Sequence, residues 1–160
     1  MNSIEWKKHH RFMLFSGWCG QTTIQIILSA CGIRKSIFEI SLFVYKWWWG
    51  TPPQLFVAYL SRYFKTVNYK TGATIADISR HLKQGHIVVI NWWDETEGHY
   101  SIVSECKKGI LTLIDSSRER EWQWSMATKE LKERWYDTLN IQNSLYHTGY
   151  MIWVDPKTKK

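Results

Sequence analysis

Three apolar runs separated by short polar loops do most to constrain how this chain folds. They are H-I-V-V-I-N-W-W at residues 86–93, H-Y-S-I-V-S-E at 99–105 and I-L-T-L-I-D at 110–115. Strand-length runs rich in β-branched residues, joined by loops this short, predict neighbouring antiparallel strands. The same reading predicts a short strand at 67–70 and a last strand at 149–154.

The first half of the chain instead repeats its apolar residues with the spacing of a helix. Residues 19–31 form one predicted helix, whose apolar stripe is Ile24, Ile27, Leu28 and Cys31. Gly32 is suited to end that helix. Further helices are predicted over residues 36–46, 53–63, 74–83 and 126–136.

Length and element order together predict the fold class. A chain of 160 residues has the length of one domain with one core. Helices followed by an antiparallel sheet predict an α+β fold in which the helices pack on the sheet. Basic residues open and close the chain, so we expect flexible tails at 1–10 and 156–160.

Charge and composition narrow the possible partners. The formal net charge of +7 can attract nucleic acid, anionic lipid or acidic substrates. Much of it lies in the two tails, so tails that aid solubility are favoured over a nucleic-acid groove, and binding of nucleic acid is not expected. The chain has neither an apolar signal-peptide core nor a run of 18 apolar residues, so secretion and a membrane-spanning helix are not expected.

The cysteines indicate the compartment. The chain has three, and they fit no C-x-x-C metal or redox pattern. We therefore expect reduced thiols in a cytoplasm, with no metal and no other cofactor. Cys31 lies on an apolar helical stripe and Cys106 at a strand end, so both are expected to be structural.

Cys19 stands where the first predicted helix begins. Unpaired backbone N–H groups and the helix dipole stabilise a thiolate there, and the thiolate is the reactive form of cysteine. A cysteine nucleophile also needs a base and a group that orients the base. His99 starts one predicted strand and Asp115 ends the next, so antiparallel pairing can place them side by side at one sheet edge.

His99 and Asp115 are also compatible with purely structural roles. His99 fits a structural histidine, and Asp115, followed by two serines, fits an Asx-turn. The residues alone therefore leave open both a nucleophile–base–carboxylate site and a purely structural role.

Five stretches carry a recognisable pattern in order along the chain. They are C-G-Q-T-T-I-Q-I-I-L, G-T-P-P-Q-L, G-H-I-V-V-I-N-W-W, E-G-H-Y-S-I-V and L-T-L-I-D-S. Together they resemble the papain-like cysteine peptidases of the bacteriocin-processing (double-glycine leader) type. The resemblance implies a papain-like fold and a peptide or protein substrate. It also implies Cys19 as nucleophile, His99 as general base and Asp115 as its orienting partner, with a thioester acyl-enzyme.

The family usually carries a glutamine six residues before the nucleophile, where it helps to stabilise the oxyanion. Met13 stands there in this chain and cannot donate a hydrogen bond, so Ser16 and Gln21 are candidate replacements. Trp92 and Trp93 precede the loop of the general base and are candidates for a substrate wall, with simple packing as the alternative. A second hypothesis follows from Met13: a catalytically weak or inactive papain-like domain that binds a peptide or protein partner.

Overall fold

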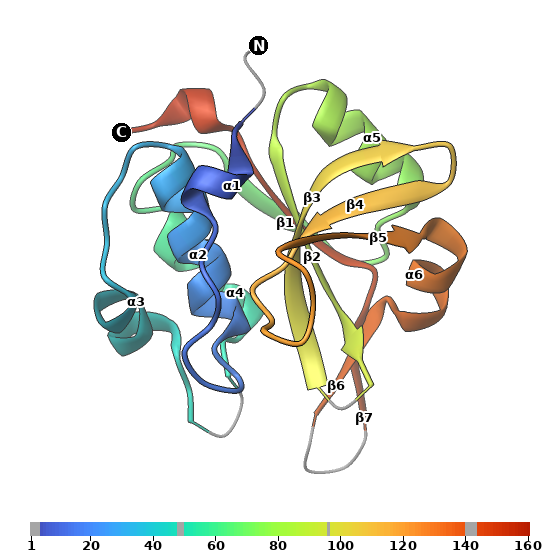
Figure 1. The fold of residues 1–160 in the computed structure, drawn as a ribbon, viewed down its shortest axis with the longest axis horizontal. Helices are drawn as coiled ribbons and strands as arrows, with labels where there is room; N and C mark the ends of the chain where they lie inside the picture. The colour runs from blue at the N-terminus through green and yellow to red at the C-terminus, as the bar shows by residue number, and fades with distance from the viewer. Residues whose placement is uncertain (1–3, 48–49, 96, 140–143) are drawn as a thin grey trace.

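The computed structural model describes residues 4–47, 50–95, 97–139 and 144–160. Helices α1 to α4 cover one face of a twisted antiparallel sheet, and α5 and α6 lie on its other face (Figure 1). The helices are α1 (Trp6–His9), α2 (Cys19–Ala30), α3 (Ile37–Val44), α4 (Pro53–Leu60), α5 (Ile75–Lys83) and α6 (Thr128–Arg134), with a 3-10 turn at Pro156–Thr158.

Eight strands are described in two sheets. They are β1 (Val67–Lys70), β2 (Ile87–Asp94), β3 (Glu97–Lys107), β4 (Ile110–Ile114), β5 (Gln123–Ala127), β6 (Tyr136–Leu139), β7 (Ser144–Thr148) and β8 (Tyr150–Val154). Six of them form one antiparallel sheet in the order β1-β8-β2-β3-β4-β5, and β6 pairs with β7 separately.

The sheet is buried on both faces because its strands alternate between two apolar clusters. On β2, Ile87 and Val89 pack with α2, α3 and α4, whereas Val88, Ile90 and Trp92 pack with α5 and α6. Successive side chains of a strand point to opposite faces, so one continuous apolar run serves both clusters. The core therefore has two layers, with the sheet between them.

Most predicted elements are confirmed, and so is the α+β class. The helices predicted from the first half of the chain appear as α2, α3, α4 and α5, and the predicted meander appears as β2, β3 and β4. The helix predicted over 126–136 begins only at Thr128, because residues 123–127 pair with β4 as strand β5. Neither α1 nor the β6–β7 hairpin was predicted. Trp48 and Trp49 lie outside the described residues.

Both predicted tails contact the folded body where they are described. Trp6 packs against the helical cluster, and His10 Nε2 donates to the carbonyl oxygen of Asp115 at 2.7 Å. At the other end, the backbone N–H of Lys160 donates to the carbonyl oxygen of Tyr63 at 2.9 Å. The first three residues lie outside the described ranges.

Within the described ranges, none of the helices combines the length and the apolar character that crossing a bilayer requires.

One close approach fixes the start of α2. A Cβ added to Gly20 would collide with Thr51, coming within 2.6 Å of its Oγ1 and still closer to its Cβ. Glycine is needed there because the loop before α4 presses directly on the helix backbone. The side chain of Thr51 in turn donates to Gln21 Oε1 at 2.7 Å. The first turn of α2 is therefore held against this loop by steric fit and by a hydrogen bond.

We expect Gly20→Ala to destabilise the protein by about 1–3 kcal/mol, because a methyl group has no space beside Thr51. Urea unfolding measures this cost. In a Thr51→Gly background the same change should cost far less, since the colliding atoms are gone and alanine favours a helix over glycine. An equal cost in both backgrounds would contradict the steric explanation.

Candidate active site

Helix α2 presents Cys19 to the sheet. Cys19 is the first residue of the helix and is buried, and its Sγ lies 3.9 Å from the carbonyl oxygen of Gly98 on β3. A first helical residue has no acceptor for its backbone N–H within the helix. The thiol and an N–H group that has no acceptor within the helix therefore start from the same residue.

Two neighbouring strands bring His99 and Asp115 together. His99 lies on β3, Asp115 follows β4, and both side chains are buried. His99 Nε2 is 2.8 Å from Asp115 Oδ1. This bond engages Nε2, and Cys19 is near enough on the other side of the site to help raise the pKa of His99. The imidazole thus stands between a thiol and a carboxylate.

Charge favours the protonated imidazole in this position. Burial lowers the pKa of His99, but the charge of Asp115 and the hydrogen bonds to Asp115 and Cys19 outweigh burial and hold that pKa well above its usual value. Burial raises the pKa of Asp115, but the charge and hydrogen bond of His99 outweigh it and hold that pKa below its usual range. An imidazolium–carboxylate pair follows at neutral pH.

Further donors hold the carboxylate of Asp115. Ser101 Oγ donates to Oδ2 at 2.9 Å, Trp124 Nε1 donates to Oδ2 at 3.2 Å, and the backbone N–H of Ser117 donates to Oδ1 at 2.8 Å. Trp92 Nε1 in turn donates to Ser101 Oγ at 3.0 Å. The sequence reasoning missed Ser101 and Trp124, although Ser101 follows the histidine by two residues and so shares its face of the strand.

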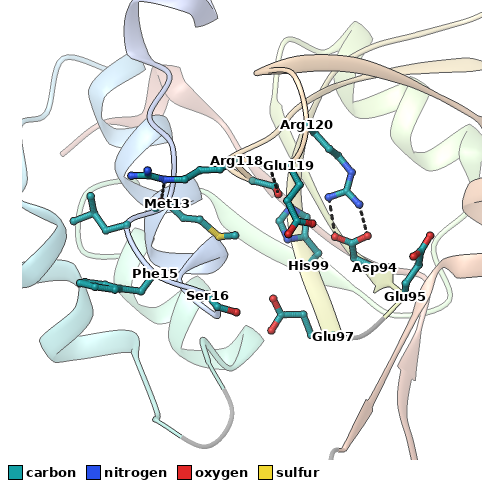
Figure 2. Close-up of a pocket in the computed structure, with 12 residues that line it drawn as sticks. Met13, Phe15, Ser16, Asp94, Glu95, Glu97, His99, Arg118, Glu119 and Arg120 are labelled. Carbon is teal, nitrogen blue, oxygen red and sulfur yellow. Dashed lines mark hydrogen bonds and ion pairs between the residues drawn. The ribbon is translucent and has the colours of Figure 1, made fainter.

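Arg120 braces the loop after Asp115. Its guanidinium pairs with both oxygens of Asp94, at the end of β2 (Figure 2). Its cation also lies over the rings of Trp92 and Trp124, at 5.4 and 5.3 Å from their centroids. A bidentate pair fixes orientation as well as distance, so Arg120 ties this loop to the β2–β3 hairpin that carries His99.

A second close approach lies next to the imidazole. A Cβ on Gly98 would stand 2.5 Å from Asp137 Oδ1, so β6 packs its carboxylate against the Gly98 backbone. The carbonyl of Gly98 faces Cys19. A side chain at position 98 would therefore have to displace the Asp137 carboxylate.

A cavity of about 410 Å³ opens beside His99. The loop that precedes Cys19 forms one wall, and the β2–β3 hairpin and the loop after Asp115 form the others (Figure 2). The side chains of Ser16 and Glu97 point into it. The lining residues are Met13, Leu14, Phe15, Ser16, Asp94, Glu95, Glu97, His99, Ser117, Arg118, Glu119 and Arg120.

The other candidate residues lie in different surroundings. Gln21 is buried and does not line this cavity; its Oε1 is bonded to Thr51, and its Nε2 is buried with no hydrogen-bond partner among the described residues. Trp92 is fully buried with its ring edge-on to His99 at 5.7 Å. Trp93 stacks on the ring of Tyr136. Of the four candidates, Ser16 is the one that shares the cavity with the imidazole.

None of the three cysteines is among the residues that line this cavity. Burial raises the pKa of Cys31 to about 11, although Lys159 opposes the shift. Cys106 Sγ accepts a hydrogen bond from Ser79 Oγ at 3.3 Å. In the part of the chain that the structure describes, no group of three or more His, Cys, Asp or Glu is placed to hold a metal ion.

Comparison with known proteins gives a family and a fold. The model of the peptidase C39 family matches residues 19–143. No curated protein matches the chain.

Solved structures share the architecture. The peptidase domain of Streptococcus ComA, described as a bifunctional ABC transporter of a quorum-sensing pathway, superposes with a TM-score of 0.66 at 12% identity, covering 90% of this chain and 96% of that one. A double-glycine-motif protease from an AMS/PCAT transporter, solved with its leader peptide, gives 0.64 at 9% identity over 89% and 88%. A putative C39-like peptidase from Bacillus anthracis gives 0.64 at 14% identity over 96% and 97%.

These identities are low, so the structural likeness establishes the papain-like α+β fold alone. The family match is independent of it and covers most of the chain, from Cys19 past Asp115. It confirms the resemblance carried by the five sequence stretches. The chain belongs to the peptidase C39 family.

Proposed function

We propose that this protein is a cysteine peptidase that hydrolyses peptide or amide bonds through Cys19, His99 and Asp115, acting as one papain-like domain. Membership of the peptidase C39 family supports the reaction class. The observation that carries the assignment of residues is the position of His99, bonded to Asp115 at 2.8 Å and close to Cys19, whose Sγ lies 3.9 Å from the carbonyl oxygen of the adjacent Gly98.

The first half of the reaction is acylation. The Cys19 thiolate attacks the carbonyl carbon of the scissile bond, and the imidazolium of His99 gives its proton to the leaving amine. The C–N bond breaks, and a thioester joins the acyl group to Cys19. In the second half, neutral His99 takes a proton from water, hydroxide adds to the thioester, and the acid product leaves the restored thiolate.

Asp115 is the orienting partner in this scheme. Its bond to Nε2 keeps the other ring nitrogen toward Cys19, and its charge stabilises the imidazolium. It does not take up the proton itself, because its pKa is held below its usual range. Ser101 and Trp124 act through Asp115 as positioning residues.

Two donors are available for the oxyanion. The backbone N–H of Cys19 starts α2, where it has no acceptor within the helix. We propose Ser16 as the second donor, because it lines the cavity beside His99. Gln21 is a weaker candidate, since it is bonded to Thr51 outside that lining.

The family match and the buried imidazolium–carboxylate pair favour catalysis over a domain that only binds peptides. A binding domain needs neither a histidine that pairs with a buried carboxylate beside its cysteine nor several donors to that carboxylate. Retaining a buried charge without a chemical role would cost stability. The proposed substrate is therefore a peptide or protein chain that the enzyme cleaves.

Alkylation by iodoacetamide tests the nucleophile. At pH 6 we expect Cys19 to react far faster than Cys31, whose pKa is about 11, and Cys106 is a second internal reference. His99→Ala should slow the reaction of Cys19 by roughly 10–100-fold, because an ordinary thiol, with a pKa near ~8.5, is less than about 1% ionised at pH 6. Mass spectrometry of the labelled peptides measures each site. Equal rates at Cys19 with and without His99 would refute the proposal.

Titration of His99 tests the role of Asp115. Asp115 raises the pKa of His99, so Asp115→Asn should lower it and the imidazolium should lose its proton at a lower pH. The His99 ring signals in NMR spectra recorded across pH report this shift directly. Ser101→Ala should change the same titration much less, because it removes one donor while the carboxylate keeps its charge.

Asp155→Asn provides the matched control, since Asp155 caps the C-terminal 3-10 turn. It should leave the His99 titration unchanged. A His99 pKa that stays the same in Asp115→Asn would show that the carboxylate does not stabilise the imidazolium.

A further inference from the structure

Helix α3 is apolar on its outward face as well as on its inward face. Ile37, Ile40 and Val44 are buried against the other helices. On the opposite side Phe38 is 62% exposed and Leu42 is 91% exposed. The outward face of a helix that only covers a core is ordinarily polar. In the ribbon view α3 lies at the outer edge of the helical layer, far from the sheet (Figure 1).

Aromatic contacts extend this surface toward the cavity. The ring of Trp18 lies 6.0 Å from that of Phe38, 6.0 Å from that of Tyr45 and 4.9 Å from that of Phe15. Phe15 is 59% exposed and also lines the cavity beside His99. Trp47, which follows α3, is 77% exposed. We call this surface the apolar face: Phe15, Trp18, Phe38, Leu42, Tyr45 and Trp47.

Positive charge is concentrated in the same layer. Residues 1–66 hold eight lysines and arginines but two acidic residues, Glu5 and Glu39, and Glu39 is paired with Lys35 at 2.7 Å. Residues 67–154 hold ten basic and eleven acidic residues, so the sheet and its far helices are almost neutral. Most of the net positive charge therefore lies in the segment that forms α1 to α4, which also carries the apolar face.

Basic side chains also lie close to the apolar side chains. The guanidinium of Arg62 is 5.2 Å from the ring centroid of Phe43, which is itself 40% exposed on α3. Lys46 comes directly before Trp47 and is exposed. Exposed apolar and aromatic groups on a layer with excess positive charge form a surface suited to the boundary between lipid headgroups and acyl chains.

We propose that the apolar face docks onto an anionic lipid bilayer, with Phe38, Leu42 and Trp47 entering the interface and the surrounding lysines and arginines facing lipid phosphates and carboxylates. Charge argues against a second copy of the chain, since a symmetric dimer through this face would bring two strongly basic layers together. Nucleic acid would satisfy the cations but would leave Leu42 without an apolar partner. Docking would also place the rim of the cavity at the membrane surface through Phe15.

Sedimentation with vesicles tests the proposal. The full chain should bind phosphatidylcholine vesicles that contain roughly 30% phosphatidylserine at roughly 0.1 M salt, and should bind pure phosphatidylcholine vesicles far more weakly. Leu42→Gln should weaken binding about tenfold, because it removes the most exposed apolar side chain from the interface. Arg62→Gln should weaken it about fivefold, and by less as salt rises.

Ile110→Gln is the matched control, since Ile110 is 44% exposed on β4 in the sheet and lies outside the apolar face. It should bind like the parent. Leu42→Gln should alkylate Cys19 at the same rate as the parent. An unchanged rate shows that the variant is folded. It also shows that weaker vesicle binding does not depend on the proposed active site, so the docking proposal and the peptidase proposal can fail separately.

Three results would overturn the docking proposal. They are no binding to phosphatidylserine vesicles, equal binding by Leu42→Gln and the parent, and equal binding to vesicles with and without anionic lipid. A dimer that Leu42→Gln dissociates, seen by analytical ultracentrifugation in a protein that binds no vesicles, would assign the face to self-association instead.

Discussion

The structure around His99 and Asp115 has to stabilise a buried ion pair. Removing a carboxylate and an imidazolium from water costs several kcal/mol per ion unless hydrogen bonds replace their hydration. Ser101, Trp124 and the N–H of Ser117 supply those bonds to Asp115. The tryptophans beside the pair therefore have two functions, since they exclude water while an indole N–H still donates.

Cys19 reaches this pair only because two layers approach each other closely. A Cβ on Gly20 would collide with Thr51 in front of α4, and a Cβ on Gly98 would collide with the carboxylate of Asp137 on β6. The glycines of the Cys-Gly and Gly-His-Tyr motifs thus leave room for these neighbours directly beside the proposed nucleophile and the proposed base.

Local patterns in the sequence predicted most elements and the pairing of β2, β3 and β4, because both depend on short-range periodicity. They also brought Cys19, His99 and Asp115 together as candidates. The insertion of β8 between β1 and β2 depends on contacts far apart in sequence and was not predicted. Strand β5 had a readable signal, since Trp124 and Met126 alternate with polar neighbours, but the helical pattern that follows hid it. Trp124 was missed as a donor to Asp115 because it becomes a neighbour of Asp115 only after β5 pairs with β4.

Cys19 lies in the helical layer, whereas His99 and Asp115 lie in the sheet and come much later in the sequence. They are therefore synthesised at different times. A ribosome makes α2 and its cysteine long before it makes β3, β4 and the strand that shields them. Until those strands have paired, the proposed nucleophile has no imidazole beside it and behaves as an ordinary thiol. In a nascent chain of this kind, completion of the sheet is the step that brings the proposed base beside the proposed nucleophile.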